Sequence, residues 1–183
     1  SVNATGTTVA INASDVIGLN LIQTLTENPN FLGAKSNTIL YDGNSLSLTL
    51  GQTEGTYDFN SLLDLGATYT SYVESFIDIV QLNYVDLFDS ATGQFDQREG
   101  LFDGDPAAYD GSTAIVQVAT TLDDPASPTA TFTPFNNLSA GSFTARGYKF
   151  RAALTTNNLD VAPKVTRLEV KIDMPDTLQS GED

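Results

Sequence analysis

The fold is decided by residues 112–174, STAIVQVATTLDDPASPTATFTPFNNLSAGSFTARGYKFRAALTTNNLDVAPKVTRLEVKIDM. Apolar and charged residues alternate near its end, a pattern typical of a strand with one buried face. The apolar set there is Val165, Leu168, Val170 and Ile172, interleaved with Arg167, Glu169 and Lys171. Four strands are predicted, over Thr113–Thr121, Thr129–Phe135, Ala145–Thr155 and Lys164–Ile172. Because no helical pattern separates them, we expect an all-β antiparallel sandwich.

Length and composition indicate one folded domain. The 183 residues are 40% hydrophobic and 17% charged, which suits a chain that buries a core. We expect a single sandwich over residues 1–175, with residues 1–56 its less clearly patterned part and 176–183 a polar tail or linker to a further module. No apolar run approaches the roughly 20 residues of a membrane span. Ser1 begins no secretion-signal pattern. Because the initiator methionine is missing, we expect a processed chain or a piece of a longer one.

Missing residue types exclude several chemistries. The chain has no histidine and no cysteine, which removes histidine-dependent and thiol nucleophiles, disulfides and zinc sites built from these ligands. It also has no tryptophan, the strongest platform for stacking a sugar. The net charge of −15, with only eight Lys and Arg residues, argues against a nucleic-acid partner.

Most of the basic residues fall late in the chain. They are Arg146, Lys149, Arg151, Lys164, Arg167 and Lys171. One interpretation is a sheet face with cross-strand ion pairs, and the other is an anion-binding patch. Arg151 follows Phe150 in a largely apolar strand, so we expect it to be partly buried with a carboxylate partner such as Asp64.

Strands are also predicted in the first half of the chain. Thr7–Ile11 is a candidate edge strand, and Tyr69–Leu82 a long β segment. Thr38–Tyr41 and Leu46–Leu50 predict a hairpin across the turn sequence Asp42-Gly43-Asn44.

From residue 57 to residue 175 the chain resembles the galactose-binding-like jelly roll of discoidin and coagulation-factor type C domains. The resemblance rests on LLDLG at 62–66 leading into YTSYVESFIDIVQL at 69–82, and on TARGYKFRAALT at 144–155 as a return strand. The later strands also look like domains of bacteriophage tail and host-specificity proteins. The resemblance implies a jelly-roll β-sandwich. The family's terminal cysteines and its tryptophan before Asp-Leu-Gly are missing here, so its ligand loops are not transferred residue by residue.

The segment between the long strand and the later sheet is the predicted ligand site. Through nearly thirty positions, aromatic and acidic residues alternate with turn residues, and long loops on a rigid sandwich are common recognition surfaces. The candidate ligand-binding residues are Tyr84, Asp86, Asp89, Arg98 and Tyr109. The alternative is that these aromatic rings anchor the loop onto the core.

A structural calcium ion is a further expectation. Asp103-Gly104-Asp105 followed by Asp110 offers hard oxygen ligands with a glycine between them. Ordinary Asp-Gly turn chemistry is the alternative.

Together these features predict a non-catalytic carbohydrate-binding module. An enzyme would have to rely on carboxylates alone, and among 23 acidic residues some pair meets a glycosidase spacing by chance. The resemblance implies a phage tail or virion protein that is assembled in the host cytoplasm, acts outside the cell and recognises host surface polysaccharide. We expect other tail subunits as partners, no membrane insertion, and a homo-oligomer that strengthens weak sugar binding by avidity. The alternatives are a ligand-free docking domain of the tail, and a bacterial adhesin or carbohydrate-binding module.

Overall fold

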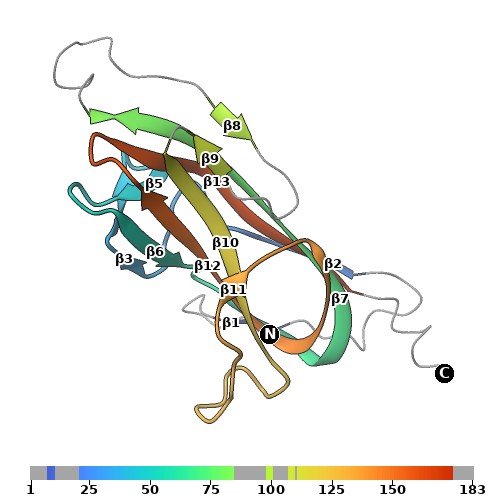
Figure 1. Cartoon of the computed structure of the whole chain (residues 1–183). Helices are drawn as coiled ribbons and strands as arrows, with labels where there is room; N and C mark the ends of the chain where they lie inside the picture. The colour runs from blue at the N-terminus through green and yellow to red at the C-terminus, as the bar shows by residue number, and fades with distance from the viewer. Residues whose placement is uncertain (1–7, 11–20, 85–97, 101–106, 110, 175–183) are drawn as a thin grey trace.

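The computed structural model describes residues 8–10, 21–84, 98–100, 107–109 and 111–174, and the fold is all-β (Figure 1). The strands are β1 Thr8–Ala10, β2 Leu21–Thr26, β3 Lys35–Ser36, β4 Thr38–Tyr41, β5 Ser45–Leu48, β6 Glu54–Asp58, β7 Leu62–Asn83, β8 Arg98–Gly100, β9 Ala107–Tyr109, β10 Ser112–Thr121, β11 Asn136–Asn137, β12 Gly141–Thr156 and β13 Val161–Met174. In the described part of the chain, no helix is long and apolar enough to cross a membrane.

The strand β7 connects the two layers of the molecule. Its first half pairs with β12 and its second half with β13, both antiparallel. Beyond β12 lie β10 and β11, and beyond β13 lie β5 and β4, so one sheet runs in the order β11-β10-β12-β7-β13-β5-β4. Figure 1 shows β7 running the length of the molecule and curling beside β12 at one end. The sheet is therefore nearly closed, and its layers face each other across one core.

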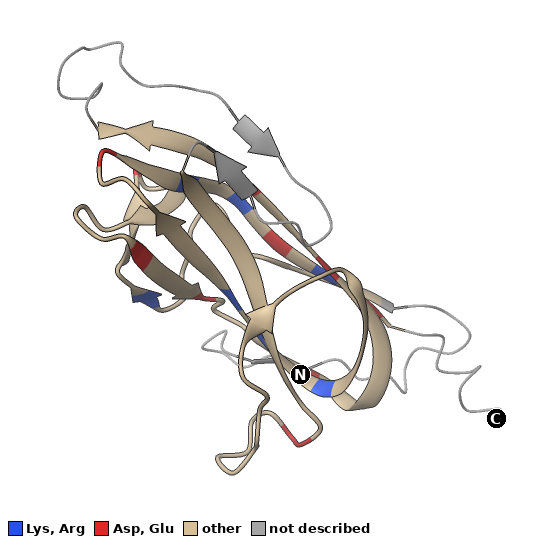
Figure 2. Ribbon diagram, in the orientation of Figure 1, with Lys and Arg blue, Asp and Glu red and all other residues tan. Residues whose placement is uncertain are grey.

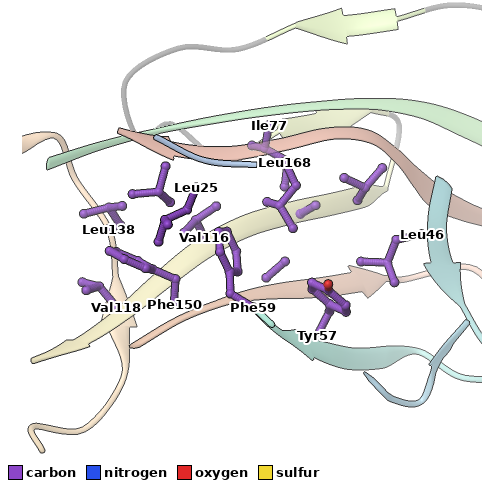
Figure 3. Close-up of a cluster of buried hydrophobic side chains, with 14 of the residues drawn as sticks. Leu25, Leu46, Tyr57, Phe59, Ile77, Val116, Val118, Leu138, Phe150 and Leu168 are labelled. Carbon is purple, nitrogen blue, oxygen red and sulfur yellow. The ribbon is translucent and has the colours of Figure 1, made fainter. Parts of the chain in front are cut away.

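The core fills the space between these layers (Figure 3). Ile77 of β7 and Leu168 of β13 point toward Val116 of β10 and Phe150 of β12. A chain of ring contacts continues from Phe150 through neighbouring aromatic side chains, with centroids 5.7–6.4 Å apart. Its further members are Phe59, Tyr57 and Phe31. Edge-to-face and tilted aromatic pairs of this kind add about 0.5–1.5 kcal/mol each beyond the area they bury.

A β-bulge explains the uneven alternation of the last strand. Val165 and Leu168 are both buried although they lie three residues apart, an odd spacing that a regular strand would place on opposite faces. The pairing of β13 with β7 shifts between Val165 and Arg167, so Thr166 is the extra residue. The alternation of apolar and charged residues predicted for this strand is confirmed, with the bulge restoring the buried face after Val165.

A second bulge fixes the ion pair of Asp64. The pairing of β12 with β7 shifts between Ala145 and Gly147, and the intervening Arg146 directs its guanidinium to the Asp64 carboxylate, at 2.9 and 3.2 Å. Burial raises the pKa of Asp64, but hydrogen bonds from Arg146 and the Gly66 amide outweigh burial and leave it below its usual value. The predicted pairing of Asp64 with Arg151 is wrong, because the bulge brings Arg146 to this carboxylate.

Several predicted elements are confirmed and two are corrected. Strands β10 and β4 match the predicted ranges to within one residue, and the β4–β5 hairpin forms across the expected turn. The predicted strand Thr129–Phe135 is wrong, since only Asn136–Asn137 pairs with β10 nearby. The long strand begins earlier than predicted, at Leu62, and passes through Gly66 at a φ of 86°. The expected antiparallel order holds except that β1 pairs in parallel with β7.

Candidate functional site

The residues predicted to bind a ligand are only partly described. Tyr84 is half-buried, packs against the core and donates its backbone amide to the Asp160 carbonyl oxygen at 2.8 Å. Arg98 lies on β8 opposite Val80, and Tyr109 lies on β9 opposite Ser112. The remaining predicted residues lie outside the described parts of the chain, so their roles stay predictions. They are the candidate ligand residues Asp86 and Asp89 and the candidate calcium ligands Asp103, Asp105 and Asp110.

The described structure contains two grooves along β12, where this strand exchanges one partner for another. On one edge, β12 pairs with β7 up to Tyr148 and with β6 from Arg151 onward. Between these pairings the chain from β6 to β7 leaves the sheet, and the Phe59 amide donates to the Phe150 carbonyl oxygen at 3.0 Å. A break in pairing of this kind opens the first groove.

The first groove has a volume of about 680 Å³, within the roughly 300–1,000 Å³ typical of ligand clefts. Its walls come from residues 33–34, 58–62 and 125–126, together with Phe135, Lys149 and Phe150. They combine an aromatic ring, an amide, a carboxylate and an ammonium group. We call this space the β6–β7 groove.

A buried hydrogen-bond network holds one wall of the β6–β7 groove. The Tyr57 hydroxyl donates to Glu27 Oε1 at 2.5 Å and accepts from the Gly33 amide at 2.8 Å. The Asn60 amide donates to the same Glu27 oxygen at 2.9 Å. Burial, followed by the hydrogen bond to Glu27, raises the pKa of Tyr57, so this hydroxyl stays a donor. The wall segments 33–34 and 58–62 are thereby tied to one carboxylate.

The second groove, of about 500 Å³, lies beside Arg151. It is bounded by residues 36–37, 54–56 and 153–155 and by Gln117, and we call it the Arg151 groove. Arg151 donates its Nε to Gln117 Oε1 at 2.7 Å, and Gln117 Nε2 donates to Asn137 Oδ1 at 3.0 Å. The guanidinium carbon lies 4.2 Å from the centroid of the Phe135 ring. Because Phe135 also lines the first groove, it joins the two.

The loop of residues 122–135 supplies the aromatic side chains beside the two grooves, and hydrogen bonds hold this loop in place. Its backbone is tied back by Thr133, whose amide donates to the Thr120 carbonyl oxygen at 2.8 Å, and by the Asp123 carboxylate, which accepts the Thr131 amide at 2.9 Å. The loop places the centroid of the Phe132 ring 4.0 Å from Lys149 Nζ. Both Phe132 and Phe135 are half-buried, each beside a cation of β12.

Lys149 and Arg151 lack the carboxylate partners that the other described arginine side chains have. Arg146 is paired with Asp64 and Asp124, and Arg167 with Glu169. Lys35 donates to two backbone carbonyl oxygens. In the described residues, Lys149 forms no ion pair, and Arg151 forms none either. Figure 2 shows the basic residues scattered singly over the strands, so this pair is a local feature and not part of a basic face.

The chemistry of the surface suits binding. Among the residues that the structure describes, no group of three His, Cys, Asp or Glu side chains is placed to hold a metal ion. The polar groups at hand are hydrogen-bond donors and acceptors at fixed positions, beside apolar rings. Such a surface can orient a polar ligand and stack its apolar face.

Sequence reasoning missed this surface for an identifiable reason. Residues 129–135 were predicted to be a strand, which would have placed Phe132 and Phe135 in a sheet and not on a loop facing β12. The alternation of Lys149 and Arg151 with buried Tyr148 and Phe150 was a usable signal, since it places both cations on the outer face of one strand.

Comparison with known proteins adds no assignment: no family model matches the chain, and no curated protein matches it.

Proposed function

We propose that this chain is a non-catalytic carbohydrate-binding module whose binding surface is formed by the β6–β7 groove, the Arg151 groove and Phe135 between them. The observation that carries the proposal is Phe135 itself, a half-buried ring held against Arg151 and lining a groove of about 680 Å³. Sugars present an apolar face and a rim of hydroxyls, so they need a ring next to fixed donors and acceptors. Lys149, Asp58 and Asn60 supply those polar groups here.

The biological setting of the proposal follows from the resemblance described above. We propose a galactose-binding-like jelly roll within a phage tail or related virion protein, acting outside the cell on host surface polysaccharide. Other tail subunits would be its neighbours, and a homo-oligomer would raise weak single-site affinity by avidity. The structural calcium ion expected at Asp103, Asp105 and Asp110 belongs to the same proposal.

The test is binding of the full chain, presented as a streptavidin-linked tetramer, to an array of bacterial polysaccharides with calcium and with a chelator. We expect retention of at least one polysaccharide, lost in Phe135→Ala. The matched control is Phe76→Ala on β7. The Phe76 ring also lies beside an arginine, since the Arg167 guanidinium carbon is 5.0 Å from its centroid. Retention in that variant should be unchanged.

Further arms separate the alternatives. Loss of binding in Tyr84→Ala or Tyr109→Ala, with Phe135→Ala unaffected, would place the site in the segment predicted from sequence. Loss with chelator alone would support the calcium prediction. Absence of binding to every polysaccharide would contradict the carbohydrate proposal and favour a ligand-free docking domain of a larger assembly.

A further inference from the structure

We propose that the glycan bound at this surface is acidic, and that Arg151 binds its carboxylate. This inference rests on the proposed function and narrows it to a class of ligand: polysaccharides that carry a sugar acid such as a uronic or sialic acid.

Arg151 is held in place with part of its donor set unused. Its Nε donates to Gln117, which is itself held by Asn137, while the guanidinium carbon lies 4.2 Å from the centroid of the Phe135 ring. Within the described chain, the terminal guanidinium nitrogens donate no hydrogen bond to protein. These nitrogens are the part of an arginine that pairs with two carboxylate oxygens at once. Because the side chain is already ordered, little rotamer entropy is lost when a ligand binds.

The protein does not supply the anion that this arginine suits. The strand register places Asp58 of β6 directly opposite Arg151, yet Asp58 is exposed and forms no ion pair with it in the described structure. Arg146, on the same strand, reaches two carboxylates, and Arg167 on β13 reaches one. In a chain with 23 acidic residues and eight basic ones, an arginine left without a carboxylate is unexpected. It lines a groove open to ligand.

A second cation supports the same ligand. Lys149 lies two residues before Arg151 on the same face of β12, a separation of about 7 Å along a strand. It lines the β6–β7 groove, while Phe135 contacts Arg151 and lines that groove as well. A sugar acid whose carboxylate meets Arg151 can therefore place its ring over Phe135 and its hydroxyls near Lys149. The two cations offset the carboxylates of Asp58 and Glu54, which also line the grooves.

The experiment compares acids with their esters on the unaltered full chain. Fragments of polygalacturonate, alginate and polysialic acid are titrated beside their methyl esters, which keep the sugar and remove the charge. We expect at least one acid to bind about tenfold or more tightly than its ester, since a charge-assisted bidentate contact is lost. Arg151→Gln should lose the same factor and bind acid and ester alike.

Two variants control for charge and folding. Arg167→Gln removes a guanidinium of the same kind that already has a carboxylate, Glu169, and should leave the acid affinity within about twofold. Arg151→Lys keeps the charge and loses the planar fork, so its affinity should fall between those of the unaltered chain and Arg151→Gln. Thermal unfolding of each variant confirms that it is folded, and the acid–ester comparison needs no variant.

The outcomes separate this inference from the proposed function. If neutral fragments or esters bind as tightly as acids and Arg151→Gln changes nothing, the acidic ligand is overturned while the carbohydrate-binding module stands. If acids bind better but Arg151→Gln matches the unaltered chain, the role of Arg151 is overturned. If neither acidic nor neutral glycans bind, the proposed function fails and this inference fails with it.

Discussion

At the scale of single residues, two arginines of β12 have different partners because the pairing of β12 with β7 is irregular beside only one of them. Arg146 lies where this pairing shifts register, facing four residues of β7, and it pairs with Asp64 of that strand. Arg151 lies in regular pairing five residues later, where alternation points it to the outer face and Gln117 holds it. The first stabilises the junction of β7 with β12, and the second has no carboxylate partner among the described residues. Counting basic residues cannot separate these roles, whereas backbone register does.

Tyr57 gives a residue-scale prediction. Tyr57→Phe removes the hydroxyl that donates to the buried Glu27 carboxylate and accepts from Gly33. We expect the free energy of unfolding to fall by about 1–3 kcal/mol, because a buried charged acceptor loses a donor. Urea denaturation followed by circular dichroism measures it. Tyr148→Phe is the control, since that buried hydroxyl donates at a longer 3.4 Å to a neutral carbonyl oxygen and should matter less. Equal losses in the two variants would contradict the role assigned to Glu27.

At the scale of elements, the grooves exist because β12 changes its partner along one edge. Its 16 residues pair with β7, then with β6 along one edge, and with β10 along the other. The change of partner opens the β6–β7 groove, and the loop 122–135 closes it from the side. Long strands that pair with two neighbours along one edge thus form both the nearly closed sheet and the grooves beside β12.

Gly147 tests how this loop is supported. A Cβ at this position would lie 2.6 Å from Pro125 Cβ and 2.8 Å from Thr121 Cγ2, too close for either to stay in place. Gly147→Ala should therefore displace Pro125, a wall of the groove, and lower stability by about 1–3 kcal/mol. Polysaccharide retention should fall with it. Gly141→Ala on the same strand is the control, since its nearest neighbour lies 3.9 Å away. If both variants unfold and bind like the unaltered chain, the close packing of the loop on β12 is not what shapes the groove.

How far the sequence predicts the structure depends on whether the signal is local. Alternation in residues 112–121 and 164–172, and the Asp42-Gly43-Asn44 turn, are local, and the corresponding strands and hairpin are confirmed. The register shift beside Arg146 and the bulge at Thr166 depend on which strand lies alongside, so the Asp64 partner was predicted wrongly. The aromatic loop was mistaken for a strand because Thr129–Phe135 has strand-like composition, while its hydrogen bonds run to Thr120 and Asp123. The grooves arise from such long-range contacts.

At the scale of the whole molecule, the net charge and the sandwich shape are both compatible with the proposed binding of an acidic sugar. A net charge of −15 disfavours polyanions at long range, but salt limits that repulsion to about 8–10 Å under physiological conditions. Recognition of an acidic sugar then depends on the local field of Lys149 and Arg151, where the described structure places no ion pair. A rigid sandwich repeated on an oligomer would multiply a weak local contact.

The most direct test of the central claim, that the outer face of β12 and its loop bind the ligand, is hydrogen exchange of the full chain with and without its polysaccharide. We expect slower exchange in residues 33–37, 58–62 and 122–137, the segments that border the two grooves and the aromatic loop. Protection confined to residues 84–111, with these three segments unchanged, would contradict it and return the site to the segment first predicted from the sequence.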